Sequence, residues 1–190
     1  MNRYFDAQGG LKKLFAGTVG TLICNVVSAI PFLVMVAAVG SLLFIVLAIY
    51  GLYQAGKDIP GCKSAFLLYV IEFVVQIFSS AFAFMPMGAA IASICVIAQA
   101  ILDMVIIYLV CTSVSEVMIV KGHGDIANFG KNVWILSVIA YVIDIVITLM
   151  AKIPVIGIIA VLLGIIVAVV KIVAGVLYLV FLYRSSEALA

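Results

Sequence analysis

Four charged side chains lie deep within the long apolar segments of this sequence, away from their ends and breaks: Glu72, Asp103, Asp144 and Lys171. Such a group costs roughly 2.5–3.5 kcal/mol to insert in a membrane, so it normally faces protein or water and often marks an ion or solute pathway. Together the four carry a formal charge of −2, which a low-dielectric interior sustains only if a proton or cation compensates it. These residue types therefore favour the binding and release of a proton or another cation.

These four residues and two glutamines fall into two layers when depth is counted from turns expected near residues 87 and 155. The inner layer holds Glu72, Asp103 and Lys171, and the outer layer holds Gln76, Gln99 and Asp144. Glu72 and Gln76 are four residues apart, as are Gln99 and Asp103, so each pair shares one side of a helix. Lys171 can pair with Asp103 or Glu72, and Asp144 also lies within its reach. We expect all six to line an ion or solute path.

The alternative is that these polar side chains only hold helices together. Hydrogen bonds between membrane helices contribute roughly 0.6–2 kcal/mol each, which is enough for a purely structural role. The residues themselves leave both interpretations open.

The composition places these residues in a membrane protein. The chain has 190 residues, of which 68% are hydrophobic and only 9% are charged, with a mean hydropathy of +1.45. A soluble domain is about half apolar and about a quarter charged, so that class is excluded. A net charge of +2 gives no electrostatic footprint for nucleic acid.

Three long apolar stretches predict the membrane-spanning helices. The stretches cover residues 14–56, 64–120 and 132–183, and each is long enough for two spans of roughly 20 residues. The expected breaks lie at Pro31 or the Gly40 region, at 86–88 and at 152–154. We therefore predict an all-α integral membrane protein: a six-transmembrane helical bundle of three helical hairpins, at 12–56, 64–120 and 132–184, forming a single membrane domain over residues 1–190.

Basic residues predict the orientation of the bundle. Only Lys152 lies at a tight turn. Eight others lie at the open ends of the hairpins: Arg3, Lys12, Lys13, Lys57, Lys63, Lys121, Lys131 and Arg184. By the positive-inside rule both termini are cytoplasmic, in a multi-pass protein of the cell membrane. Interfacial aromatic residues are expected toward the same side: Tyr50, Tyr53, Tyr108, Trp134, Tyr178 and Tyr183.

A shift of 68 residues superposes the second hairpin on the third. It aligns Lys63 with Lys131, Gln76 with Asp144, Pro86 with Pro154 and Asp103 with Lys171. Internal duplication is common in transporters, but flanking lysines and a turn proline also suit any hairpin built for one bilayer. A helical hairpin repeat and chance similarity both remain open.

Small residues share one face of the last span. They are Ala160, Gly164, Ala168 and Gly175, and small residues at such spacing allow close helix packing. We expect this face to pack against a helix and to hold Lys171 toward the protein interior. The expected partners are the lipid bilayer and either a second copy or other membrane subunits, with no nucleic acid.

Motifs for catalysis and metal binding are missing. There is no HExxH, GxSxG or phosphate-binding glycine loop, and the single His123 lies in a glycine-rich loop. Four cysteines without metal-ligand spacing predict neither a metal site nor a disulfide framework. We expect no enzyme activity, no metal and no cofactor. The favoured function is a small transporter or channel for a cation, or for a small solute coupled to a cation or proton; the alternative is a non-catalytic accessory or scaffold subunit of a larger membrane complex.

In layout alone the chain resembles two kinds of membrane protein. Six helices in 190 residues, with both ends on one side, are similar to the substrate-binding subunits of energy-coupling-factor vitamin transporters. Three proline-broken hairpins look like the small acid-resistance membrane proteins. No site residue is carried over from either resemblance.

Overall fold

The computed structural model describes residues 4–28, 30–82, 88–150 and 157–190, with side chains given in these ranges except at 82, 88–92 and 157–162. Over these residues the fold is helical and contains no strand. The elements are α1 (Phe5–Val27), the short 3-10 helix η1 (Pro31–Leu33), α2 (Val34–Ala55), α3 (Pro60–Phe82), α4 (Gly88–Val120), α5 (Gly124–Met150) and α6 (Gly157–Ala188). Six helices are long and apolar enough to cross a membrane, which confirms the predicted all-helical fold and its six long elements.

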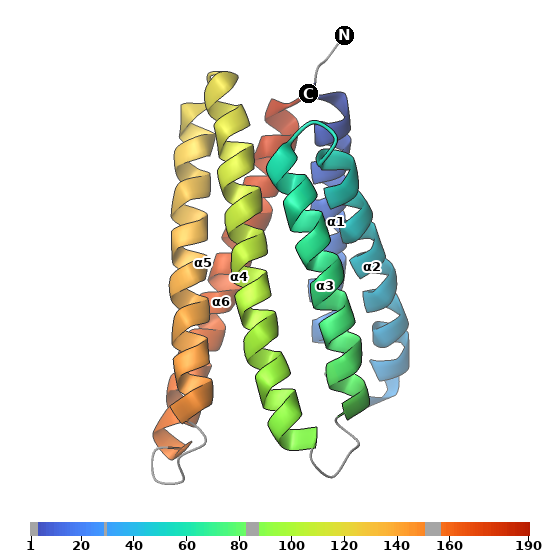
Figure 1. The fold of residues 1–190 in the computed structure, drawn as a ribbon, viewed down its shortest axis with the longest axis vertical. Helices are drawn as coiled ribbons and strands as arrows, with labels where there is room; N and C mark the ends of the chain where they lie inside the picture. Colours follow the sequence, from blue (N-terminus) through green and yellow to red (C-terminus); the bar gives the residue numbers. More distant parts are fainter. Residues whose placement is uncertain (1–3, 29, 83–87, 151–156) are drawn as a thin grey trace.

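The helices form a ring in chain order. Each long helix packs on the next, and α6 closes the ring against α1, while α4 and α6 touch only slightly. Both termini lie at one end of the bundle, together with the α2–α3 and α4–α5 links (Figure 1). We call the half of the bundle near this end the terminal half and the other the opposite half.

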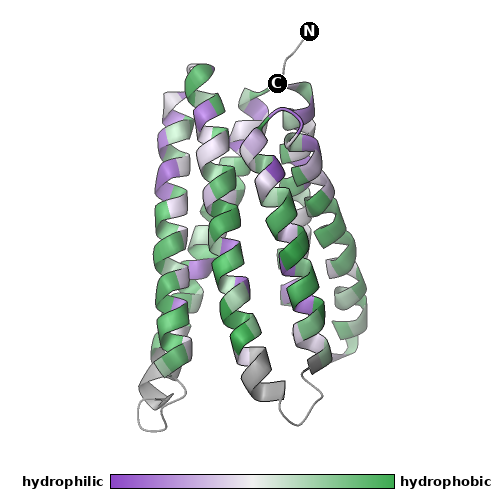
Figure 2. Cartoon of the chain, viewed as in Figure 1, coloured by the Kyte–Doolittle hydropathy of each residue, from purple (hydrophilic) through white to green (hydrophobic). Residues whose placement is uncertain are grey.

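The outer faces of the helices are apolar. Met35 is 84% exposed and Ile172 is 61% exposed, and hydrophobic residues cover most of each helix between its ends (Figure 2). An exposed apolar surface of this extent marks contact with lipid or with other proteins.

The break between the first two long helices lies at a proline rather than at a glycine. Helix α1 ends at Val27 and η1 begins at Pro31, whereas Gly40 lies inside α2. The first predicted turn therefore lies at Pro31, whose fixed φ and missing N–H suit the start of a helix. The other two predicted breaks fall wholly or mostly outside the described residues.

Several helices begin before the predicted hairpins do. Helix α1 begins at Phe5 rather than near 12, and α5 begins at Gly124 rather than near 132. The apolar stretches show which part of each helix is apolar. A helix continues beyond that part where its backbone N–H and C=O groups have hydrogen-bond partners. The Ala7 N–H, in the first turn of α1, donates to Asp58 Oδ2 at 2.8 Å, and this satisfies one of the unpaired N–H groups at a helix start.

Glycines bring α1 and α2 into backbone contact. A Cβ added at Gly17 would lie 2.7 Å from both the Ala48 nitrogen and the Phe44 carbonyl oxygen, and one added at Gly51 would lie 2.5 Å from the Leu14 nitrogen. No larger residue fits at either position unless the helices move apart. Small residues permit this close packing between membrane helices, and here they join the first two helices.

The buried core belongs to the terminal half. Its largest fully buried side chains include Leu52, Met118 and Phe181, and one cluster joins residues of all six long helices. In the opposite half the described core shrinks to a small cluster of Ile147 and Val167. Tyr178, expected in an interfacial belt, is only 8% exposed and lies in the main core.

Candidate functional site

Two carboxyl groups meet between α3 and α4. Glu72 and Asp103 are close enough to share a hydrogen bond between their side chains. Such a bond requires a proton on one of the two groups, because two carboxylates offer only acceptors. The other Glu72 oxygen, Oε2, is buried and has no hydrogen-bond partner among the described residues. The pair can therefore hold one proton between its carboxyl groups, and one Glu72 oxygen stays free to accept a hydrogen bond or to bind a cation.

An ion pair joins α5 to α6 beside these carboxyls. Lys171 Nζ lies 2.9 Å from Asp144 Oδ2, and the same ammonium lies 4.8 Å from the centre of the Tyr141 ring. The lysine had three candidate partners by sequence, and the structure selects Asp144. Because this pair is neutral, the formal −2 charge of the four groups would fall on Glu72 and Asp103, and a proton held between these two carboxyls lowers it to −1.

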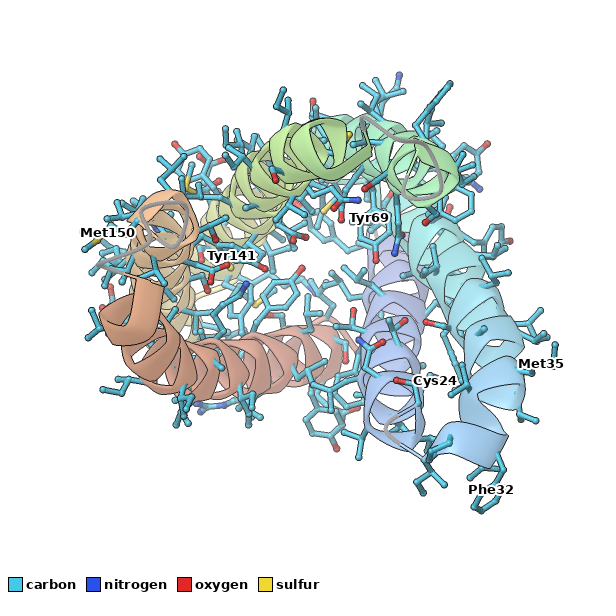
Figure 3. The ribbon with its side chains drawn as sticks, turned by 90° about the horizontal axis from the view of Figure 1, so that it is seen from below. Cys24, Phe32, Met35, Tyr69, Tyr141 and Met150 are labelled. Carbon is cyan, nitrogen blue, oxygen red and sulfur yellow. The ribbon has the colours of Figure 1, made fainter. Side chains whose placement is uncertain are left out.

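Tyrosines connect the two pairs into one cluster. Tyr141 shares a hydrogen bond with Asp103, and Lys171 is close enough to act on Asp103 electrostatically. Tyr69, on α3, interacts electrostatically with both carboxyls of the first pair. Seen along the bundle, Tyr69 and Tyr141 both point toward the centre of the ring (Figure 3). We call Tyr69, Glu72, Asp103, Tyr141, Asp144 and Lys171 the polar cluster.

The polar cluster lies next to the edge of the packed core. On α3 the core ends at Ala65, and on α6 it ends at Tyr178, roughly two turns from Lys171. A small cavity of about 100 Å³ adjoins the cluster and is lined by Tyr141, Lys171 and Tyr178 among others. Cavities of this size and polarity can hold water. The polar cluster thus places charged side chains beside a cavity that has room for a small ligand.

Two of the predicted path residues lie apart from the ion pair. Gln76 is exposed and lines a groove of about 410 Å³ between α2 and α3, together with Ser41 and Ser80. Gln99 is half-buried on α4, one turn from Asp103. The structure therefore gathers the four predicted ionisable residues into one site, whereas Gln76 belongs to a separate groove.

The predicted packing face of α6 has no close neighbour in the described part of the chain. A Cβ added at Gly164 or Gly175 would meet nothing within 4 Å, and Ala168 is exposed. The Ala160 side chain lies outside the described residues. Gly175 instead lines the small cavity beside Lys171, so this face leaves space. Packing of the face against another chain stays a prediction.

Two tyrosines of the polar cluster were not predicted as site residues from the sequence. Tyr69 lies three residues before Glu72 and Tyr141 three before Asp144, a spacing that places each pair on one helix face. That spacing was a usable signal for Tyr69. Among the described residues, no three His, Cys, Asp or Glu side chains lie together as metal ligands would.

Comparison with known proteins adds no relative. No protein-family model, no curated protein and no solved structure matches this chain. The functional argument therefore rests on the polar cluster alone.

Proposed function

We propose that the six helices insert in the cell membrane as three helical hairpins, with both termini in the cytoplasm. The exposed apolar faces of the helices support insertion, because lipid is the solvent that such surfaces suit. The basic residues near the terminal end support the orientation.

Within this membrane domain the polar cluster acts as a cation- or proton-binding element of a small transporter or channel. The observation that carries this proposal is the hydrogen-bonded Glu72–Asp103 pair, in which one Glu72 oxygen is buried without a partner. A group that is protonated in one state and ionised in another is what proton or sodium coupling requires. The transported solute is then a cation, or a small solute moved together with one.

The contrast between the two halves supports a path with one closed end. The terminal half is filled by the core, so a solute cannot pass there without rearrangement. The opposite half has few buried side chains among the described residues, and the small residues of α6 leave space there. Alternating access, in which parts of the bundle rock around a central site, would relieve this closure.

Cation flux in proteoliposomes tests the proposal. Purified protein is reconstituted with an entrapped pH-sensitive dye or a sodium-sensitive dye, and a potassium diffusion potential drives uptake. We expect the wild-type protein to carry protons or sodium, and Asp103→Asn and Glu72→Gln to lower the flux at least about tenfold because neither amide releases a proton.

Matched controls separate this effect from misfolding. Asp125→Asn and Glu187→Gln change the same residue types in exposed ion pairs at the terminal end and should keep wild-type flux. All variants should reconstitute to the same yield. Wild-type flux in both Asp103→Asn and Glu72→Gln would exclude the proposed role of the pair.

A non-catalytic accessory or scaffold subunit is the second candidate. The face of α6 around Gly164 and Ala168 favours it, because this face has room for a helix from another chain. Under this alternative Gly164→Leu prevents a complex from assembling, whereas the isosteric changes at Asp103 and Glu72 leave it intact. The mass of the particle purified from its native membrane distinguishes the two, since unchanged mass in Gly164→Leu contradicts the accessory role.

A further inference from the structure

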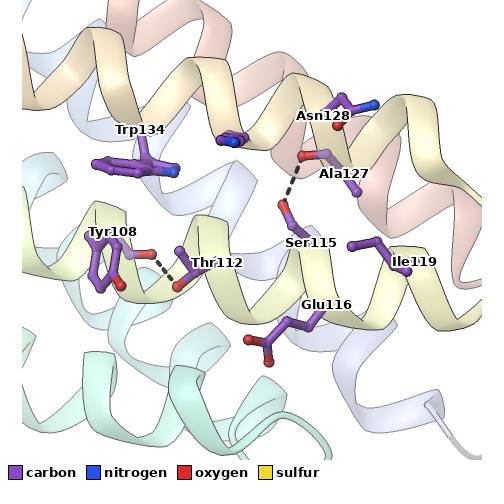
Figure 4. A pocket seen from close by; sticks show the side chains of 9 residues that line it. Tyr108, Thr112, Ser115, Glu116, Ile119, Ala127, Asn128 and Trp134 are labelled. Atoms are coloured by element: carbon purple, nitrogen blue, oxygen red, sulfur yellow. Dashed lines mark hydrogen bonds between the residues drawn. The ribbon is translucent and has the colours of Figure 1, made fainter.

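A second polar site lies on the surface of the terminal half and contains no residue of the polar cluster. It is a groove of about 310 Å³ between α4 and α5. Figure 4 shows its residues, with Tyr108, Thr112, Ser115, Glu116 and Ile119 on α4 and Ala127, Asn128 and Trp134 on α5. Because the groove opens on the outside of the bundle, a ligand would enter it from the surrounding medium and not from the centre of the ring.

On the α4 wall of this groove, two hydroxyl groups and a carboxylate act as acceptors beside the Tyr108 hydroxyl. Thr112 donates its hydroxyl hydrogen to the Tyr108 carbonyl at 2.7 Å, and Ser115 donates its own to the Ala127 carbonyl at 3.2 Å. The hydrogen of each hydroxyl is already engaged in a hydrogen bond, so the two hydroxyl oxygens can only accept hydrogen bonds from a ligand. Glu116 adds an exposed carboxylate.

The α5 wall provides donors instead. Lys131 contributes an exposed ammonium, and Trp134 and Asn128 contribute an indole N–H and an amide. In the described part of the chain, neither Lys131 nor Glu116 belongs to an ion pair, unlike Lys12, Lys57, Lys171 and Arg184. One groove thus carries two uncompensated charges of opposite sign, one on each wall.

The aromatic residues of the groove are typical of the region where lipid headgroups meet acyl chains. Tyr108 and Trp134 pack edge to face, with ring centres 5.2 Å apart. Tyrosine and tryptophan favour this depth of a bilayer, and a lysine there extends its ammonium toward the headgroups. A ligand that matches the groove is therefore dipolar at one end and apolar at the other.

We propose that this groove binds phosphatidylethanolamine from the surrounding bilayer, an inference that rests on the proposed membrane insertion. Its phosphate would accept hydrogen bonds from the α5 wall, and its primary ammonium would donate to Glu116 and the hydroxyls of the α4 wall. Phosphatidylcholine lacks the donor hydrogens that the α4 wall requires. Phosphatidylglycerol lacks the cation that Glu116 pairs with.

Lipid retention measured by native mass spectrometry tests the proposal. The full chain is released from vesicles of equimolar phosphatidylethanolamine, phosphatidylcholine and phosphatidylglycerol with identical acyl chains. We expect retained phosphatidylethanolamine to exceed each of the others about threefold to fivefold, the contribution of one exposed ion pair. Glu116→Gln should abolish this preference, and Glu116→Lys should shift it to phosphatidylglycerol.

Lys121→Gln is the matched control, since the Lys121 ammonium lies over the Tyr4 ring at 5.4 Å and outside the groove. It should keep the wild-type pattern, whereas Lys131→Gln should lower the retention of all three lipids, because each of them carries the phosphate that this ammonium would bind. Equal retention of the three lipids, a preference for phosphatidylglycerol in the wild type, or an unchanged preference in Glu116→Gln overturns the groove proposal alone. Retention of no phospholipid also overturns the groove proposal, whereas failure of the chain to enter the vesicles at all overturns membrane insertion as well.

Discussion

The terminal half and the opposite half of the bundle use the same apolar residue types, yet only the terminal half packs them into a core. Phe181 is fully buried in the terminal half, whereas Phe78 in the opposite half is 56% exposed. In a bilayer an apolar side chain gains little by leaving lipid for protein, so helix association depends on shape and polar contacts. Glycines supply the shape in one half, and charged residues supply the contacts in the other.

This difference suggests a division of labour between the halves. In the terminal half, α1 and α2 touch backbone to backbone and Asp58 holds the start of α1. The opposite half contains the polar cluster and the open α6 face. A well-packed base beside a half with few buried contacts is an arrangement suited to a site that must change state.

The largest expected effect follows from deleting a core ring. Phe181→Ala should lower the free energy of unfolding by about 3 kcal/mol, as for other buried aromatic rings. The matched change Phe78→Ala should cost about 1 kcal/mol or less, because the ring is more than half exposed. Unfolding in SDS titration from mild-detergent micelles measures both. Equal losses would show that the two halves do not differ in packing.

A smaller effect is expected from adding one methyl group to a glycine. Gly17→Ala should destabilise the protein by about 1–3 kcal/mol, because the new Cβ overpacks against α2. Gly164→Ala should be neutral or slightly stabilising, because nothing lies near and alanine is the better helix former by about 1 kcal/mol. The same titration compares them, and a tolerated Gly17→Ala would contradict the close α1–α2 contact.

The smallest effect concerns the ion pair of the opposite half. A double-mutant cycle of Asp144→Asn and Lys171→Gln should give a coupling energy of about 1 kcal/mol. This is below the 3–5 kcal/mol typical of breaking fully buried pairs, because each side chain is about one-third exposed, at 33% and 36%. Coupling near zero would mean that Lys171 interacts mainly with Asp103 or the Tyr141 ring.

The sequence was sufficient to predict helix number and type and the four charged members of the site. Long apolar stretches and proline breaks predict helices directly. A charged side chain inside such a stretch needs a polar partner in the interior of the protein. Helix ends were predicted less well, because Lys13 and Lys131 mark where the apolar residues begin, whereas hydrogen bonds and packing decide where the helix begins.

Pairing within the site could not be predicted, because it depends on how helices rotate and slide against one another. The 68-residue shift aligns Gln76 with Asp144 and would oppose Gln76 to Asp103, as Asp144 opposes Lys171. The structure instead brings Glu72, one turn earlier, to Asp103. The same limit applies to glycines: composition shows them on both α1 and α6, but only three-dimensional proximity to α2 makes those of α1 the packing residues.

The closure of the ring by α6 against α1 has a consequence for biosynthesis. Ribosomes deliver helices in chain order, so Glu72, Asp103 and Asp144 are all synthesised before Lys171 is. Until the last helix arrives, the nascent chain holds three acidic groups without the lysine that compensates one of them. The assembly intermediate with five helices is therefore the stage at which quality-control proteases and chaperones have the most to recognise.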